Sequence, residues 1–113
     1  MVILSQGGVA IRDAVADELI TGQYGSDGTT ESESDTSLGT PIASTIKTLA
    51  ITKSGLTIEA VHELISTEGN GNTLREYALQ SSTQDITRVT TTELVKDSTK
   101  EVVTTSVMFV SIN

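Results

Sequence analysis

The sequence of 113 residues contains no cysteine, one proline, one histidine and three aromatic side chains. Without cysteine the chain forms no disulfide, binds no metal through thiolates and uses no thiol as a nucleophile. Because Tyr24, Tyr77 and Phe109 are its only aromatic residues, its core must consist mainly of Val, Ile, Leu and Ala. No apolar run approaches the roughly 20 residues that span a bilayer, so we expect no membrane partner.

Basic residues are also scarce: the chain has seven Lys and Arg but 15 Asp and Glu, which gives a formal net charge of -8. A surface of this charge repels a phosphate backbone, so we expect no nucleic-acid partner. Gly69 and Gly71 are not followed by a Lys-Ser or Lys-Thr pair and do not make a phosphate-binding loop. The composition therefore argues against nucleotide and nucleic-acid binding.

The abundant residues are Thr, Val and Ile, whose β-branched side chains favour strands. Residues 56–65 alternate between two faces, one of which is apolar except for His62, and we predict a long central strand there. Further strands are predicted at 42–53, 74–79, 86–93 and 101–112. The last two are joined by the polar turn 96–100, which predicts an antiparallel hairpin.

One helix is predicted near the N-terminus, over about residues 8–20. Ile11, Ala14, Val15 and Leu19 lie on one stripe at helical spacing, and Gly22 and Gly25 are expected to end the helix. With strands over about 42–112, the predicted fold class is mainly β: an antiparallel β-sandwich-like domain with one N-terminal amphipathic helix. The length fits a single domain, 1–113.

The segment of about residues 26–40 is rich in Ser, Thr, Asp and Glu and is predicted to be a long surface loop. Its carboxylates could bind a hard cation, because Ca²⁺ takes oxygen ligands, although the spacing of an EF-hand is missing. The candidate metal ligands are Asp27, Glu31, Glu33 and Asp35. Paired carboxylates could also hydrolyse a glycoside, but three aromatics scarcely line a sugar cleft. A solvated loop is the favoured interpretation.

His62 is the one side chain that could act as the base of a hydrolase, and no Gly-x-Ser-x-Gly elbow accompanies it. Its inward position on an amphipathic strand predicts a packed or hydrogen-bonded histidine instead. We therefore expect no catalytic residue, no cofactor and no enzymatic activity.

The chain resembles a family of small structural proteins from tailed viruses of bacteria and archaea, nearly from end to end. The most specific similarity is a Glu-x-Asn-Gly-x-Thr-x-x-Glu-x-x-Leu pattern over residues 68–79. Further similarities are the Gly-Gly start before the helix at Gly7 and Gly8, the Asp-Thr-x-Leu-Gly end of the loop at 35–39, and the Lys-Asp-Ser turn at 96–98. Ala78, where the family often has Gly, and residues 24–28 depart from the pattern.

This resemblance implies a virion component, made in the host cytoplasm, that belongs to a tail, fibre or baseplate. A capsid decoration or vertex (turret) protein is the alternative within the same class. A monomeric module that binds a glycan or a cation through the acidic loop is the alternative of another class.

A Thr-rich sheet with a thin core can gain stability by burying faces or edges against identical copies. We therefore expect a homo-oligomer, a trimer or pentamer, that also contacts other virion proteins. The candidate contact residues are Asp35, Leu38, Asn70, Arg75 and Glu76. Arg75 and Glu76 could also form an intersubunit or cross-strand ion pair, but an ordinary surface pair is favoured.

Overall fold

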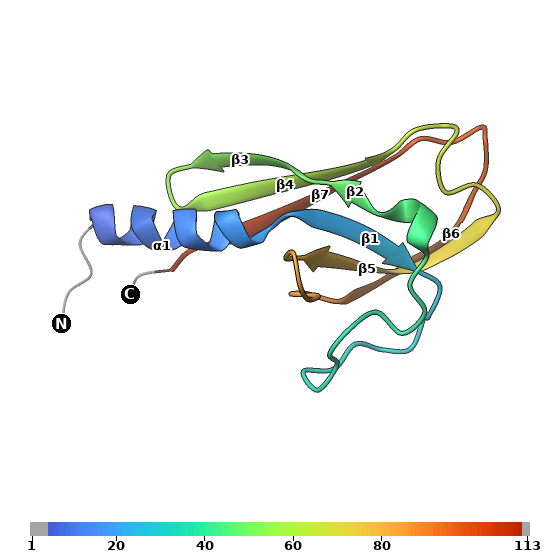
Figure 1. Cartoon of the computed structure of the whole chain (residues 1–113), viewed down its shortest axis with the longest axis horizontal. Coiled ribbons are helices and arrows are strands. Elements are labelled where there is room, and N and C mark those ends of the chain that lie inside the picture. Colours follow the sequence, from blue (N-terminus) through green and yellow to red (C-terminus); the bar gives the residue numbers. More distant parts are fainter. Residues whose placement is uncertain (1–4, 112–113) are drawn as a thin grey trace.

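The computed structural model describes residues 5–111, in which one α-helix precedes seven β-strands (Figure 1). A long loop and a short 3-10 helix, η1, separate the first strand from the second. The elements are α1 Ser5–Glu18, β1 Thr21–Gly25, η1 Ala43–Thr45, β2 Lys47–Thr48, β3 Ala50–Ser54, β4 Thr57–Leu64, β5 Asn72–Gln80, β6 Val89–Lys96 and β7 Val102–Phe109.

The strands form two antiparallel sheets in a sandwich-like arrangement. Sheet A has the order β2-β1-β5-β6, and sheet B has the order β3-β4-β7. The buried residue Leu49 lies between β2 and β3, where the chain passes from one sheet to the other. The predicted fold class, mainly β and sandwich-like with one N-terminal helix, is confirmed.

Strand β4 lies at the centre of sheet B, as its alternating pattern predicts. Ile58, Ala60, His62 and Leu64 are buried, and the residues between them face outward or are partly covered. The strand pairs with β3 on one side and with all eight residues of β7 on the other. Alternation is informative here because one face meets the core and the other meets solvent.

A cluster of three rings forms between the sheets. Tyr24 of β1, Tyr77 of β5 and His62 of β4 have ring centroids 4.9–5.5 Å apart, within the range of favourable aromatic contacts. Around them pack aliphatic residues from both sheets, among them Ile58, Leu64, Leu74 and Leu79. Two of the three aromatic residues thus lie in the core, while Phe109 is exposed.

The prediction that Gly22 and Gly25 end the helix is wrong, because both residues lie within β1. Both glycines are buried beneath side chains of other strands. A Cβ atom at position 22 would overlap the hydroxyl of Tyr77 and lie 2.9 Å from Cδ2 of His62. Gly22 is therefore required because the ring cluster leaves no room for a side chain on this strand.

Replacing Gly22 by Ala is expected to lower the free energy of unfolding by about 1–3 kcal/mol, because the added methyl group overpacks the ring cluster. Urea denaturation followed by circular dichroism measures the change. Gly28→Ala is the matched control, since a Cβ there would contact only the flexible side chain of Arg75. Equal losses for both variants would contradict this interpretation.

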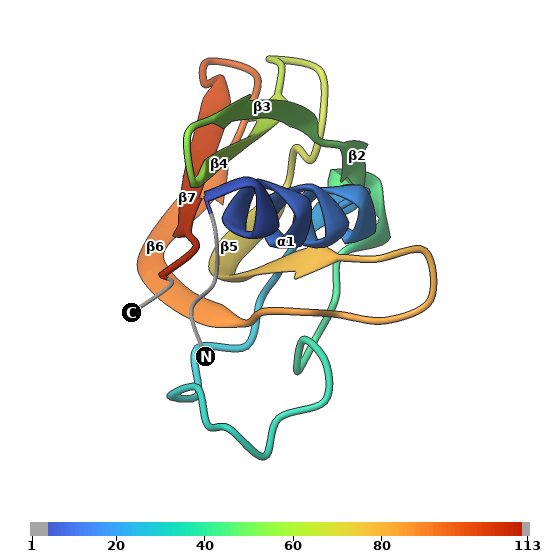
Figure 2. The same cartoon turned by 90° about the vertical axis from the view of Figure 1, so that its left-hand side faces the viewer.

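The helix differs from its prediction in bounds and in orientation. Helix α1 ends at Glu18, and Ala16 and Leu19 are buried, whereas Ile11 and Val15 of the predicted apolar stripe are 44% and 37% exposed. The helix lies before the first residue of β1, at the end of the molecule opposite the tip of that strand, and contacts β3 and β4 along one side (Figures 1 and 2). A helix that packs against one sheet only leaves part of a wide apolar stripe uncovered.

The predicted hairpin of the last two strands is wrong. Strand β6 pairs with β5 in sheet A, whereas β7 pairs with β4 in sheet B. The turn between them therefore connects the two sheets instead of two neighbouring strands. Strand β6 also begins later than predicted, at Val89, and β7 ends at Phe109; the predicted end at Ile112 lies outside the described residues. The strand predicted at 42–53 is divided into η1, β2 and β3.

Candidate functional site

The carboxylate of Glu76, in the middle of β5, is fully buried beneath the acidic loop of residues 26–40. Three backbone amides of this loop donate hydrogen bonds to it: Asp27 N to Oε2 at 3.0 Å, Gly39 N to Oε1 at 2.8 Å and Thr40 N to Oε2 at 2.9 Å. These amides come from both ends of the loop. A single side chain of the sheet therefore holds the loop closed at its base.

Arg88, just before β6, neutralises this carboxylate. Its Nε donates to Glu76 Oε1 at 2.8 Å, and the Arg88 side chain is only 7% exposed. The remaining guanidinium nitrogens donate to the loop, to Asp35 Oδ2 at 3.0 Å, Thr29 O at 2.8 Å and Asp27 O at 3.3 Å. The guanidinium fork thus links the sheet to three points of the loop.

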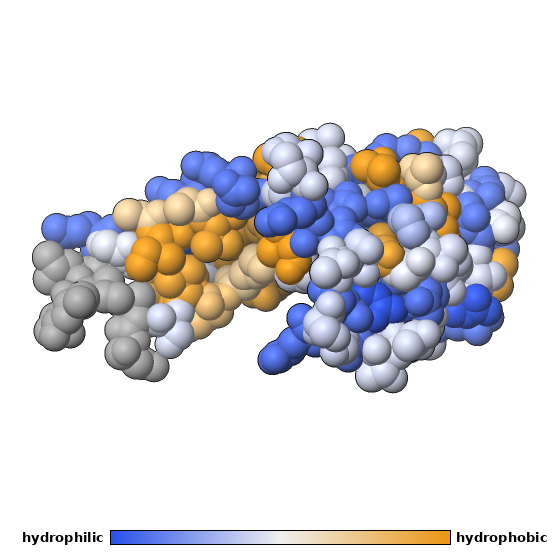
Figure 3. All heavy atoms as spheres, turned by 60° about the horizontal axis from the view of Figure 1, so that its bottom comes forward, coloured by the Kyte–Doolittle hydropathy of each residue, from blue (hydrophilic) through white to orange (hydrophobic). Residues whose placement is uncertain are grey.

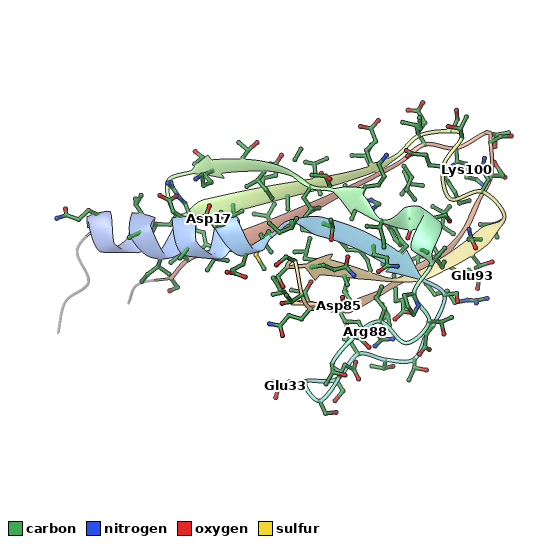
Figure 4. The ribbon with its side chains drawn as sticks, in the orientation of Figure 1. Asp17, Glu33, Asp85, Arg88, Glu93 and Lys100 are labelled. Atoms are coloured by element: carbon green, nitrogen blue, oxygen red, sulfur yellow. The ribbon has the colours of Figure 1, made fainter. Side chains whose placement is uncertain are left out.

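Other side chains fasten the loop at its rim. Asp85 accepts a hydrogen bond from Leu38 N at 2.9 Å, and Glu31 accepts hydrogen bonds from the backbone and hydroxyl of Thr90. Arg75 donates to Ser26 O at 3.2 Å. The predicted surface loop is mostly exposed, yet it is held by partners 36 or more residues away in sequence, among them Arg88 and Asp85 (Figure 4).

The four candidate metal ligands do not converge. Asp27 accepts from Thr29 N at 2.8 Å, Asp35 is paired with Arg88, Glu31 is bound to Thr90, and Glu33 lies at the outer tip of the loop (Figure 4). Within residues 5–111, no group of three or more acidic or histidine side chains is arranged to hold a metal ion. Three of these four carboxylates, those of Asp27, Glu31 and Asp35, thus bind groups of the protein itself.

A hollow of about 400 Å³ lies between the loop and the segment before β6. Nine of the ten residues that line it are polar or charged, and Ile86 is the exception. It is lined by Glu31, Ser32, Glu33, Asp35, Thr36, Ser37, Asp85, Ile86, Thr87 and Arg88. His62, the only histidine of the chain, is buried elsewhere, so no base of that kind reaches this hollow.

Two of the five candidate contact residues are unavailable to a second copy. Glu76 is fully buried, and Leu38 is 4% exposed beneath the loop. Asp35 and Asn70 are exposed, and Arg75 is partly exposed. Arg75 lies in an exposed cross-strand pair, 3.5 Å from Glu93 of β6. Glu76 faces the other side of the strand and is buried, so the prediction that it takes part in a surface pair is wrong.

His62 is a packed, hydrogen-bonded histidine, as predicted. Its ring is fully buried, and Nε2 donates to the backbone oxygen of Thr45 at 2.8 Å. Burial lowers the pKa of His62 below its ordinary value of 6.5, more than the hydrogen bond to Thr45 raises it. The neutral ring is therefore the form that the folded protein keeps.

Glu76 remains ionised for a different reason. Burial alone would raise the pKa of its carboxyl, but the hydrogen bonds from Thr40 N, Arg88, Gly39 N and Asp27 N outweigh this effect and hold the pKa below 4.5. The folded state therefore binds protons at both Glu76 and His62 less readily than the unfolded chain does.

Acidification is expected to destabilise the fold in two stages. Because the folded-state pKa of His62 is lowered, the stability that it contributes is present above about pH 6.5 and lost as the pH falls through its folded value. Glu76 adds a second loss that begins near pH 4.5. Melting temperatures across this range measure both. His62→Gln should remove the upper stage. Glu76→Gln should reduce the lower stage without abolishing it, because other carboxyls with lowered pKa values, among them Asp27 and Glu31, also contribute there. A melting temperature that rises on acidification would contradict the assignment.

The sequence missed the role of Arg88 and the burial of Glu76. The sequence did indicate that Glu76 is buried, because the apolar residues Leu74 and Ala78 lie two positions away on the same face of the strand, and both are buried. Nothing in the sequence indicated that Arg88, 12 residues away, is the partner of Glu76. The register between β5 and β6 also shifts between Leu74 and Glu76, which simple strand pairing does not predict.

No family model, curated protein or solved structure matches this chain. Within residues 5–111, no helix is long and apolar enough to cross a membrane.

Proposed function

We propose that this chain is a non-enzymatic structural subunit of a tailed virus particle, associated with its tail, fibre or baseplate, and that it acts as a homo-oligomer in contact with other virion proteins. The observation that carries the proposal is the outer side of β7, where Val103, Val107 and Phe109 are 60%, 64% and 73% exposed. A group of strongly exposed apolar side chains on one face of a strand favours contact with another protein.

The apolar surface continues at one end of the molecule. Figure 3 shows apolar atoms gathered at the end that carries α1, where Ile11 and Val15 are exposed. The described core beside this surface is small and contains only two aromatic residues. A thin core with a large apolar exterior favours a chain whose native state includes its neighbours.

The residues of the 68–79 pattern, on which the resemblance to the viral family rests, have structural roles in this fold. Gly69 and Gly71 have positive φ angles of 68° and 85°, which form the tight connection before β5. Glu68 accepts a hydrogen bond from Ile65 N at 3.1 Å and pairs with Lys47, and Asn72 donates to Gly69 O at 2.9 Å. The pattern thus builds a rigid turn and an anchor for the loop, which suits a structural subunit better than a catalyst.

The hollow beneath the acidic loop favours one alternative of another class, a monomeric module that binds a glycan or a cation. Its carboxylates, however, already accept hydrogen bonds from Arg88, Thr90 and the loop backbone. Calorimetry with Ca²⁺ and a glycan array test this alternative directly. A decoration or vertex protein of the capsid remains the alternative within the structural class.

The test of the proposed function is the native mass over a series of concentrations. Light scattering coupled to gel filtration should give a multiple of the 11.9 kDa chain mass. Antibody-labelled virus particles viewed by negative-stain microscopy should then place the subunit on the tail or the head. A chain that stays monomeric at every concentration and labels no particle would contradict the proposal.

A further inference from the structure

The outer edge of β7 carries free backbone hydrogen-bonding groups. Val110 N donates to Leu56 O at 2.9 Å, which continues the β4–β7 register and places the even-numbered residues of β7 in the hydrogen-bonded pairs with β4. The odd-numbered residues, from Val103 to Phe109, therefore direct their N–H and C=O groups away from β4. Among residues 5–111, sheet B has no further strand on that side.

This edge is the one that lacks the usual protection. Within the described residues the sheets have four edge strands; β2 and β3 contain Lys47 and Lys53, and β6 contains the exposed charge of Glu93. Lys100 also donates to Val95 O on β6. Strand β7 has eight residues with no charged side chain and no proline. Lysines and prolines on edge strands prevent pairing with other chains, so an edge without them is open to such pairing.

We propose that β7 pairs antiparallel with β7 of a second copy of this chain across a two-fold axis, so that the two B sheets form one continuous sheet. The proposal rests on the proposed function, for which it names the partner and the surface. An edge strand of alternating donors and acceptors complements itself in this orientation, and a two-fold contact uses the same patch on both copies.

The two-fold axis passes through Ser106, because Ser106 is the centre of the four residues, 103, 105, 107 and 109, whose backbone groups point away from β4. In this register Val103 lies opposite Phe109 of the other copy, and Thr105 lies opposite Val107. All four edge residues of each copy then pair, which gives about eight interchain hydrogen bonds. A protein interface of ordinary size has about ten hydrogen bonds, so this strand supplies most of that number.

Charge permits a second copy at this edge. The chain carries a net charge of -8, so two copies can approach closely only where acidic side chains are few. Glu101 directly precedes β7, and with the axis at Ser106 the two copies of Glu101 lie at opposite ends of the pairing. The exposed carboxylates of Glu59 and Glu63 are on β4, one strand away from the edge. In the joined sheet the two β4 strands are three strand spacings apart, about 14 Å, which exceeds the screening length of about 8 Å at physiological salt.

A like charge placed at the edge tests the proposal. Val107→Glu should raise the dimer dissociation constant at least about tenfold, because two added carboxylates meet diagonally near the axis. Val95→Glu is the matched control, since it makes the same change at a comparably exposed valine on the other sheet's edge strand, β6. Circular dichroism confirms that both variants fold, and analytical ultracentrifugation measures the constant.

The absence of native cysteine allows a second test of the register. Ser106 lies opposite itself at the proposed axis in a non-hydrogen-bonded pair, where the two Cα atoms are about 4.5 Å apart, within the range of a disulfide. Ser106→Cys should therefore form a disulfide-linked dimer on mild oxidation. Thr52→Cys on β3 is the control and should stay unlinked.

The outcomes separate this inference from the proposed function. If the chain is oligomeric but Val107→Glu leaves the dissociation constant unchanged, or Ser106→Cys does not cross-link, the β7 pairing is wrong and the homo-oligomer stands. A trimer or pentamer likewise overturns the two-fold contact alone. If the isolated chain is monomeric but Val107→Glu prevents its incorporation into particles, another virion protein occupies this edge and the proposed self-pairing is wrong. A monomer that joins no particle overturns both.

Discussion

Replacing Arg88 by Met is expected to lower the free energy of unfolding by about 3–5 kcal/mol, the usual effect of removing one partner from a buried ion pair. The Glu76 carboxylate is fully buried and would be left without its counter-charge. Arg88 also donates to Asp35, Thr29 and Asp27, so the loop of residues 26–40 loses its attachment in the same variant. Chemical denaturation measures the first effect, and hydrogen exchange at the Gly39 and Thr40 amides measures the second.

Arg75→Met is the matched control for this prediction. Arg75 is 41% exposed and lies 3.5 Å from Glu93, which is 59% exposed, so this surface pair should contribute only about 0–1 kcal/mol. Its hydrogen bond to Ser26 O adds about 1 kcal/mol, still well below the effect expected at Arg88. The double variant Glu76→Gln with Arg88→Met removes the buried charge as well and should be less destabilised than Arg88→Met alone. Equal losses for Arg88→Met and Arg75→Met would show that the buried pair does not hold the loop.

The elements that the sequence predicted well are those whose environment follows a local rule. Strand β4 has one face against the core, so its alternation directly indicated the inward positions of Ile58, Ala60, His62 and Leu64. The surface loop was likewise indicated by its composition. In both cases neighbouring residues in the chain carry the information.

The errors arise where distant segments decide the structure. The apolar stripe of the helix showed which residues could be buried, but sheet B covers the side that includes Ala16 and leaves Ile11 in solvent. The turn at 96–100 is compatible with a hairpin of β6 and β7. In the fold, however, β6 pairs with the long strand β5 and β7 pairs with the long strand β4. Sequence alone does not contain this choice between partners.

The candidate site shows the same limit more strongly. The acidic loop suggested a cation site because its carboxylates are close in sequence, but in the fold their partners are Arg88, Thr90 and backbone amides. One guanidinium, distant in sequence from the loop, takes the place that a cation would occupy in that hypothesis. The loop is thus a structural feature of the surface of sheet A, and the open edge of β7 becomes the surface that points to function.

Tyr77→Ala is the second variant with a large expected effect, a loss of about 3–5 kcal/mol in the free energy of unfolding. Tyr77 is the largest fully buried side chain, and it contacts Tyr24 and His62 in the ring cluster. Its removal leaves a cavity that the β-branched and aliphatic neighbours cannot fill without moving both sheets. Since domains of this size have unfolding free energies of about 5–15 kcal/mol, the variant should be partly unfolded at moderate temperature.

Phe109→Ala is the control that separates burial from loss of an aromatic ring. Phe109 is 73% exposed on β7, so its truncation should change the unfolding free energy by less than about 0.5 kcal/mol in dilute, monomeric samples. At concentrations where copies associate, the melting temperature of wild type should rise, because binding of a second copy stabilises the folded state. The melting temperature of Phe109→Ala should rise less. Thermal melts at low and high protein concentration measure both effects. A concentration-independent loss as large as that of Tyr77→Ala would show that Phe109 supports the single chain and not its contact with another copy.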